Sequence, residues 1–418
     1  MDILFIHNNF PGQFKHLAPA LAAQGHRVLA LTPRVDGVKK WEGVTVVPYQ
    51  IKAPKAQQVH SWLLDMDTKL HRAEGAYRAA VDLKKQGFNP VAVIAHPGWG
   101  ESLFMKDVWP DARLGVFCEL YYQSVDGGMN FDPEFPVREV ATEPLRIRMK
   151  NLNNRLHHEI MDAGICPTKF QLSSYPDSLK SKITISHDGI DTNNVRPNPE
   201  ARLEIAGLSL TKEDEVITFV NRNLEPYRGY HIFMRALPEL LKRRPNATVL
   251  IVGGDGVSYG AAAPRGQTWK QIFIDEVRGQ ISDEDWARVH FLGKIPYDKF
   301  LTMLQVTSAH VYLTYPFVLS WSMIEAMASE APIVANDVAP VTEVLVDGQN
   351  GLLVDFFDKD GLVDRVCTVL DDKELAARMG KAARELAVSK YDLKSVCMPN
   401  QLNWIENLIA RPRIDPQD

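Results

Sequence analysis

Short apolar runs alternate with segments of helical period along the first part of the chain. The runs have the length of buried strands, and the segments between them repeat apolar residues three or four positions apart. The runs span residues 3–6, 27–31, 44–48, 91–95 and 114–117. Strands that alternate with helices in this way are typical of βαβ units, so the pattern predicts a parallel sheet covered by helices.

The same pattern restarts in the second half of the chain. Apolar runs at residues 216–220, 248–252, 289–292, 310–313 and 333–335 are separated by helix-period segments such as 232–241. Between the two blocks, residues 189–199 are rich in Asp, Asn, Gly and Pro, which favour turns. We therefore expect two successive α/β domains, followed by a helix over residues 402–409.

Composition narrows the class of protein. The 418 residues suffice for two or three domains, and a formal net charge of −5 argues against a nucleic-acid binder, which is usually basic. The four cysteines lie far apart without a CxxC pair, so we expect neither a metal site nor a disulfide framework. No basic leader and no membrane-spanning apolar run is evident, which favours a cytoplasmic location.

Polar and aromatic residues follow the strands of the first block, where ligands of open α/β sheets bind. Gly12 follows the first strand, and a glycine there lets backbone N–H groups approach a phosphate, although a plain tight turn explains it equally well. The segments after two further strands carry His96, Trp99, Glu101, Glu119, Tyr121 and Tyr122. Several such groups at one sheet edge favour a binding site.

The second block places arginines, glycines and a glutamate after its strands. Arg222 and Arg228 are predicted to share a loop, where guanidinium groups suit a diphosphate, although two solvated arginines are the simpler interpretation. Gly253 lies in a glycine-rich turn after the next strand. Glu325 has two interpretations: a carboxylate that binds the vicinal hydroxyls of a ribose, or a capping-box partner of Ser322.

In order and spacing, these motifs resemble the retaining GT-B glycosyltransferases of glycosyltransferase family 4. The similarity covers nearly the whole chain and depends on no single motif. It rests on Arg222 with 228–229, on segments 252–256, 291–295, 325–328 and 332–335, on Glu343 with 348–354, and, in the first block, on Gly12, 17–18, 25–28 and 188–191.

The resemblance implies a GT-B architecture, in which two Rossmann-like domains with parallel sheets face a central cleft. We expect an acceptor-side domain over residues 1–192, a donor-binding domain over 193–398, and a helix over 399–418 that crosses back to the first domain. The implied reaction transfers a sugar from a nucleoside-diphosphate sugar to a carbohydrate, lipid-linked or protein acceptor, in glycan or glycoconjugate biosynthesis. It requires no cofactor and no metal.

The resemblance also implies residue roles. Arg222 and Arg228, the latter where a lysine is usual, hold the donor diphosphate, and Gly12 offers backbone N–H groups to the same phosphates. Further donor contacts are expected from Gly253, Lys294, Ile295, Phe317, Leu319, Ser320, Trp321 and Glu325. Lys294 and Ile295 would contact the nucleobase and Glu325 the ribose. His96 or Glu119 would take the place of a histidine that the family often carries, or neither does, and Trp99, Glu101, Tyr121 and Tyr122 are expected on the acceptor side.

Phe317 departs from the family pattern, which usually has a glutamate at this position to contact sugar hydroxyls. A phenyl ring accepts no strong hydrogen bond, so one hypothesis is a donor sugar with a less polar face, such as a deoxy-sugar. The alternative is a loop shift that turns Phe317 into the core, while a group from residues 255–259 recognises an ordinary hexose.

Two other functions share the expected fold. A sugar-nucleotide epimerase and a partner subunit that has lost donor binding both remain alternatives, because fold does not fix function. The basic residues Arg146, Arg148, Lys150 and Arg155 form a locally positive segment. They could contact an anionic membrane surface or a lipid-linked acceptor, although a solvated charged helix face is the simpler interpretation.

Overall fold

The computed structural model describes residues 1–52, 59–124, 127–136 and 139–411. The chain divides into two compact units, of which the first comprises Met1–Gly189 with Lys394–Asp418 and the second Ile190–Leu393. The break after Gly189 falls at the start of the turn-rich segment 189–199. Of the expected final segment 399–418, residues 412–418 lie outside the described residues.

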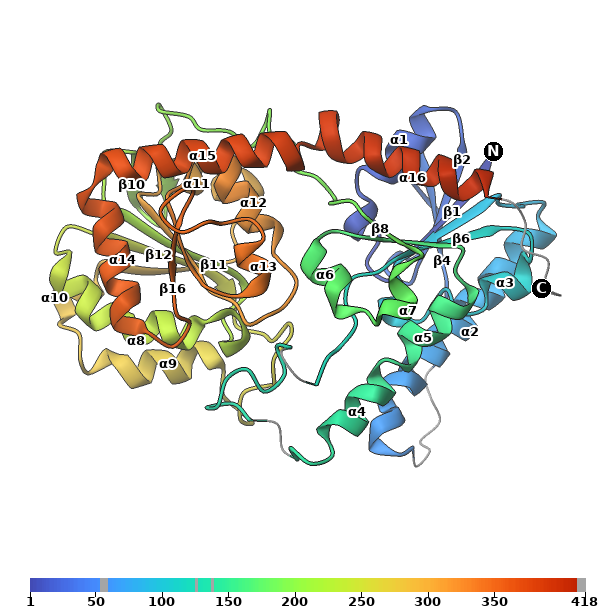
Figure 1. Cartoon of the computed structure of the whole chain (residues 1–418), viewed down its shortest axis with the longest axis horizontal. Coiled ribbons are helices and arrows are strands. Elements are labelled where there is room, and N and C mark those ends of the chain that lie inside the picture. Colours follow the sequence, from blue (N-terminus) through green and yellow to red (C-terminus); the bar gives the residue numbers. More distant parts are fainter. Residues whose placement is uncertain (53–58, 125–126, 137–138, 412–418) are drawn as a thin grey trace. The chain divides into compact units, whose positions relative to one another are not determined.

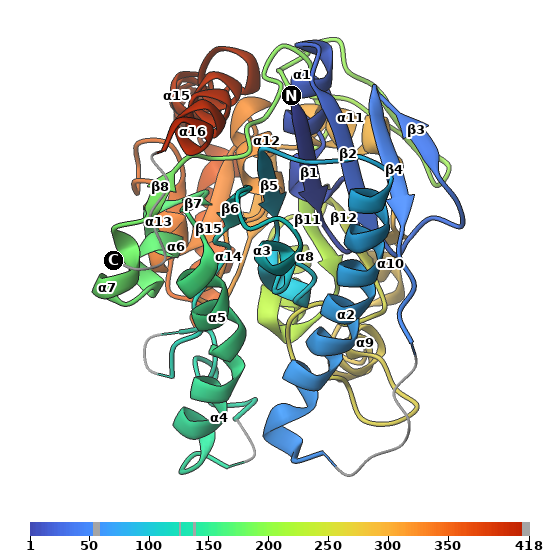
Figure 2. The same cartoon turned by 90° about the vertical axis from the view of Figure 1, so that its right-hand side faces the viewer.

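The first unit contains an eight-stranded sheet in the order β3-β4-β2-β1-β5-β6-β7-β8. The strands are β1 (Asp2–Ile6), β2 (Arg27–Thr32), β3 (Lys39–Trp41), β4 (Val44–Pro48), β5 (Ala92–Ala95), β6 (Arg113–Phe117), β7 (Ala163–Cys166) and β8 (Ile183–Ile185). All neighbours pair in parallel except β3 and β4. Figure 2 shows β1, β2 and β4 side by side.

Helices cover both faces of this sheet, as its continuous apolar strands require. The helical segments are η1 (Gly12–Phe14), α1 (Leu17–Ala23), η2 (Ser61–Leu63), α2 (Leu64–Lys85), η3 (Pro97–Trp99), α3 (Met105–Val108), α4 (Glu143–Lys150), α5 (Leu152–Ile160), α6 (Lys169–Ser174) and α7 (Asp177–Lys180). One core includes buried residues of α2 and α3, and the other includes buried residues of α1.

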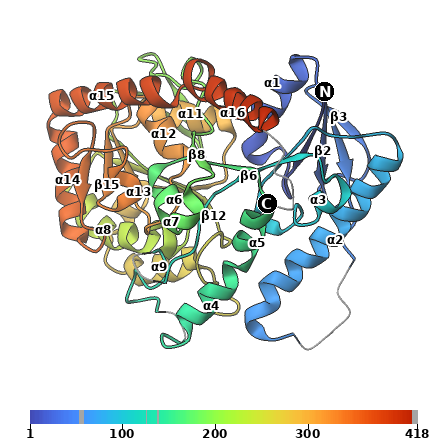
Figure 3. The ribbon, with the colours of Figure 1, turned by 45° about the vertical axis from the view of Figure 1, so that its right-hand side comes forward.

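The final helix, α16 (Met398–Ala410), packs on the first unit beside α1 (Figure 3). Trp404, Ile405 and Leu408 are buried in the same core as α1. The Trp404 indole N–H donates to the carbonyl of Gly164, at 3.2 Å. A Cβ atom on Gly115 would lie 2.6 Å from the Trp404 ring, so this glycine in β6 makes room for the helix.

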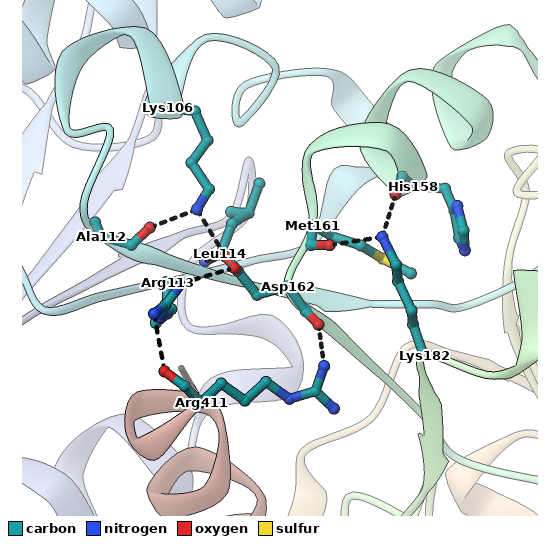
Figure 4. Close-up of polar contacts among 9 residues, drawn as sticks. All are labelled: Lys106, Ala112, Arg113, Leu114, His158, Met161, Asp162, Lys182 and Arg411. Atoms are coloured by element: carbon teal, nitrogen blue, oxygen red, sulfur yellow. Dashed lines mark hydrogen bonds and ion pairs between the residues drawn. The ribbon is translucent and has the colours of Figure 1, made fainter. Parts of the chain in front are cut away.

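A polar network fastens the end of α16 to the amino-terminal edge of the first sheet (Figure 4). The Asp162 carboxylate accepts from Lys106 Nζ and from the Leu114 N–H, both at 2.7 Å, and from Arg113 Nη1 at 3.2 Å. Arg411 donates to the Asp162 carbonyl and accepts from Arg113 Nη2. These charge-assisted bonds anchor the chain just beyond α16.

The second unit contains a six-stranded, all-parallel sheet in the order β13-β12-β11-β14-β15-β16. Its strands are β11 (Val216–Asn223), β12 (Thr248–Gly254), β13 (Val289–Gly293), β14 (Ala309–Tyr312), β15 (Ile333–Asn336) and β16 (Leu352–Val354). A separate antiparallel pair consists of β9 (Leu203–Ile205) and β10 (Leu208–Leu210).

The helical segments of this unit lie between its parallel strands or follow the last of them, and the α-helices can be followed in Figure 1. They are η4 (Pro226–Arg228), α8 (Tyr230–Arg243), α9 (Trp269–Arg278), α10 (Asp283–Trp286), α11 (Tyr297–Val306), α12 (Trp321–Ala328), α13 (Ala339–Thr342), α14 (Lys359–Asp371) and α15 (Lys373–Tyr391). A π-helical turn, Leu393–Cys397, follows α15. The strands predicted from apolar runs all form, within three residues of the expected ends.

Candidate functional site

Gly12 and His7 form a tightly packed turn after β1. A Cβ atom on Gly12 would lie 2.3 Å from His7 Nε2, and Gly12 has a φ of 47°, so both packing and backbone conformation favour glycine here. His7 Nδ1 accepts from the Asn9 N–H at 2.9 Å, so its proton lies on Nε2, 2.7 Å from Gln13 Oε1. Burial, followed by the charge of His96, lowers the pKa of His7 to about 3, so this ring is neutral at neutral pH.

His96, at the end of β5, lies in an aromatic cluster with its edge toward Glu119. Its ring is 5.2 Å from His7, 4.8 Å from Trp99 and 5.3 Å from Phe117, all between ring centroids. Nδ1 accepts from the Gly98 N–H, so the neutral ring carries its proton on Nε2, which lies 3.6 Å from the Glu119 carboxylate. The structure therefore brings Trp99 and Glu119 next to His96. His7, which was not selected from the sequence, also contacts His96.

The remaining acceptor-side candidates have structural partners. Glu101 is fully buried and accepts from the Tyr49 hydroxyl at 2.8 Å, and burial raises the pKa of Glu101. Glu101 is therefore a hydrogen-bond partner of Tyr49 within the core and does not reach the surface. The Tyr121 hydroxyl accepts from Arg155 at 2.9 Å, and the Lys150 ammonium lies 4.0 Å from the centre of the Tyr122 ring.

These last contacts also bear on the basic segment of the sequence. Its residues belong to α4 and α5, where Arg146 pairs with Glu143 and Arg148 is exposed. Arg155 and Lys150 contact the two tyrosines, so three of the four basic residues have partners within the unit. Within the described residues, no helix has the length and hydropathy needed to cross a membrane.

Arg228 is a buried charged residue of the second unit. It ends η4, at the carboxyl edge of β11, and its side chain and backbone are almost fully buried, with 5% of the residue exposed. Nη1 donates to Thr314 Oγ1 at 2.7 Å, and both terminal nitrogens lie 3.3 Å from the Val318 carbonyl. The guanidinium is therefore a fixed positive charge whose terminal nitrogens already have protein acceptors.

Arg222 has a different environment from the one that we expected. It lies within β11 rather than in a loop, and it is exposed. Its guanidinium forms no hydrogen bond or ion pair with any residue that the structure describes. The interpretation of two solvated loop arginines thus fails for Arg228 and remains compatible with Arg222.

Phe317 is the buried member of an aromatic cluster around Arg228. Its ring centroid is 5.2 Å from that of Tyr227, 4.9 Å from that of Tyr259 and 5.5 Å from the guanidinium carbon. Only 8% of Phe317 is exposed. Tyr259 belongs to the segment 255–259, so this packing favours the loop-shift alternative over an aromatic platform open to a deoxy-sugar.

The two glycines that end β12 pack against residues at neighbouring strand ends. A Cβ atom on Gly253 would lie 2.7 Å from Leu224, and one on Gly254 would lie 2.9 Å from the Lys294 side chain. Close packing therefore accounts for both glycines, and it brings Lys294 from the end of β13 to the end of β12. Lys294 is exposed and Ile295 half-buried, which leaves both able to contact a ligand.

The start of α12 lies at the same carboxyl edge. Ser320 is its N-cap, because the Ser320 hydroxyl accepts from the Ser322 N–H at 3.1 Å. The proposed capping box of Ser322 with Glu325 is therefore wrong. The Ser320 N–H donates to the Tyr312 hydroxyl at 3.0 Å, while Leu319, Ser320 and Trp321 are all half-buried.

Glu325 instead faces α11. Its Oε1 accepts from the Tyr297 hydroxyl at 2.6 Å, and the residue is 7% exposed. Burial and the adjacent carboxylate raise the pKa of Tyr297, which therefore stays protonated as the donor. Sequence reasoning missed Tyr297, although its position four residues after β13 placed it near the same edge.

Comparisons with known proteins cover both units. A model described as "Glycosyl transferase family 4 group" matches residues 24–195, and one described as "Glycosyl transferases group 1" matches residues 202–386. A D-inositol 3-phosphate glycosyltransferase of Corynebacterium efficiens is 29% identical over 61% of this chain, a match that spans only 56% of that protein. A glycogen synthase of Mycobacterium tuberculosis is 27% identical over 91% of this chain and 87% of its own.

Solved structures share the fold at low identity. Sucrose-phosphate synthase from Thermosynechococcus elongatus matches with a TM-score of 0.74 and 17% identity, covering 98% of this chain and all of the other. Anabaena HepE, solved in complex with UDP-glucose, matches with a TM-score of 0.64 and 17% identity over 97% of this chain and all of its own. These similarities place the chain in the GT-B fold.

Proposed function

The chain belongs to the family-4 type of glycosyltransferases with the GT-B fold, and we propose that it is a retaining enzyme that uses a nucleoside-diphosphate sugar. The observation that supports this most directly is the set of groups at the carboxyl edge of the second sheet. A fixed guanidinium, Arg228, lies beside the loop that leads to the N-cap of α12, and Glu325 follows in that helix. The acceptor is a hydroxyl group of a growing glycan or glycoconjugate.

The proposed chemistry is charge stabilisation. As the glycosidic bond to the nucleotide breaks, negative charge grows on the departing diphosphate, and positive charge develops at the sugar. Arg228 and the N–H groups at the start of α12 offset that negative charge from fixed positions, which costs little reorganisation. Glu325 holds the ribose, and Lys294 and Ile295 lie beside the base. Because protein groups supply the positive charge, the proposed reaction needs no metal.

Product analysis tests the proposal. A panel of nucleotide sugars, incubated with the purified protein and candidate acceptors, should yield a free nucleoside diphosphate together with a new glycosidic bond of retained anomeric configuration. Addition of EDTA should leave the rate unchanged. An isomerised sugar nucleotide would instead identify an epimerase, and the absence of both donor binding and turnover would identify an impaired partner subunit.

Glu325→Gln should weaken nucleotide binding by about tenfold, because a neutral amide is a poorer acceptor for ribose hydroxyls than a carboxylate. Thermal stability should change little, since the amide oxygen can still accept from Tyr297. Titration with a nucleoside diphosphate and a melting curve measure the two effects. Tyr297→Phe is the matched control, because it removes the hydrogen bond between Tyr297 and Glu325 and leaves the carboxylate. Equal affinities in both variants and the wild type would exclude the ribose role.

A further inference from the structure

The buried carboxylate of Glu225 binds a distant stretch of backbone. Glu225 precedes η4 and is fully buried. Oε1 accepts from the Ser258 N–H at 3.1 Å, Oε2 accepts from the Gly260 N–H at 3.0 Å, and the Tyr259 N–H lies 3.3 Å from both oxygens. Three consecutive backbone donors thus converge on one carboxylate, an arrangement whose bonds are strengthened by its charge.

This anchor determines where Tyr259 lies. The Tyr259 ring centroid is 5.0 Å from the Arg228 guanidinium carbon and 4.9 Å from the Phe317 ring. Tyr259 itself is 40% exposed, whereas Arg228 is 5% exposed. The tyrosine therefore lies between the Arg228 guanidinium and solvent, and it is held there through its own backbone N–H group and those of its two neighbours.

Neighbouring contacts support the same segment from either side. Asn223 Nδ2 donates to Ser258 Oγ at 2.6 Å, and the Trp269 indole donates to the Ala261 carbonyl at 2.8 Å. A Cβ atom on Gly260 would lie 3.3 Å from Glu225 Oε2, so the backbone at Gly260 closely approaches the carboxylate. The Glu225 carboxylate accepts from the backbone N–H groups of residues 258–260 themselves.

We propose that Glu225 is a positioning residue, which holds residues 258–260 so that Tyr259 covers and orients the Arg228 guanidinium. The inference rests on the proposed function of Arg228 in donor binding. A guanidinium stacked on an aromatic ring and shielded from water keeps a single orientation, and its charge acts more strongly on a nearby diphosphate than it would in water. Glu225 acts only through Tyr259 and contacts neither substrate nor diphosphate.

Limited proteolysis tests the anchor without any substrate. Arg265 is exposed in the same loop and offers a trypsin site, which Arg265→Gln would remove and so identify. Glu225→Gln should increase the rate of cleavage after Arg265 by about tenfold, because the amide replaces a charged acceptor and turns an N–H group toward the backbone donors. Glu225→Asp keeps the charge and serves if the amide variant does not fold. Wild-type cleavage rates in folded variants would overturn the proposal.

A double-mutant cycle tests the route through Tyr259. Tyr259→Ala should reduce donor-dependent turnover by about tenfold, and Tyr259→Phe should retain it, because the ring makes the contact with Arg228. Combining Tyr259→Ala with Glu225→Gln should cost no more turnover than either change alone. If the losses of the two single variants multiply in the double variant, Glu225 acts by a route other than Tyr259. If Glu225→Gln is cleaved faster but keeps full turnover, the position of Tyr259 over Arg228 does not matter for the reaction. If the protein used no nucleotide sugar at all, the cleavage result would still stand while the wild type itself showed no turnover.

Discussion

Arg228→Ala should reduce turnover by a few hundred-fold or more, equivalent to about 3 kcal/mol or more of lost transition-state stabilisation, as when one preorganised donor to a developing anion is removed. The guanidinium is held by Thr314 and Val318 and flanked by two aromatic rings, so its charge lies in one place before the reaction begins. Initial rates with a saturating nucleotide sugar measure the loss.

Arg228→Lys is the matched control. It keeps the charge and gives up the planar fork that donates to two acceptors at once. We expect it to recover most of the turnover, since a lysine is usual at the corresponding position in the family that the motifs resemble. Arg222→Ala tests separately the other arginine that the resemblance assigns to the diphosphate, which is exposed in β11. If Arg228→Ala folds and turns over at the wild-type rate, the proposed charge stabilisation is wrong.

The fold could be predicted because its central strands are buried on both faces. Such strands appear as uninterrupted apolar runs, as in Ile3 to Ile6 and Thr248 to Val252, and each was identified from the sequence. The strands that were missed are short, and some lie at an edge. β3 has the sequence Lys-Lys-Trp, β8 has three residues, and β7 contains a glycine, so none produces a clear apolar signal. Edge strands often carry charged side chains, which discourage pairing with other chains. The same charges interrupt the apolar run by which a strand is recognised in the sequence.

The candidate site could be predicted only in part. Because parallel strands end at one edge, residues that follow them could be assigned to that edge from the sequence alone, and His96, Trp99 and Glu119 do lie together there. The burial of each side chain could not be predicted in this way. Arg228 and Glu101 are buried, whereas Arg222 is exposed and Glu119 is half-buried. The hydrogen bond between Glu225 and Ser258 could not be predicted from the sequence either. The two residues are 33 positions apart, and no sequence motif links them.

Phe317→Ala should destabilise the protein by about 3–4 kcal/mol, because truncating a buried phenylalanine removes its packing and leaves a cavity. The lost contacts are those with Tyr227, Tyr259 and the Arg228 guanidinium. Phe317→Leu fills much of the same volume and should lose less than half as much stability. Denaturant unfolding of the three proteins measures the difference. Phe317→Glu is a poorer test, since its carboxylate would be introduced close to the Arg228 guanidinium and would neutralise the charge under study.

The same variants decide what Phe317 does for the donor. If its role is to pack against the Arg228 guanidinium, the ratio of turnover with a glucose-type donor to turnover with its 6-deoxy analogue should favour the hydroxylated sugar in the wild type. Phe317→Leu should then leave that ratio unchanged even where absolute turnover falls. A site that contacts the sugar through the phenyl ring behaves differently, because changing the ring alters transition-state binding of one donor more than of the other. A wild-type preference for the deoxy-sugar that Phe317→Leu abolishes would therefore place the ring against the donor and reject the packing interpretation.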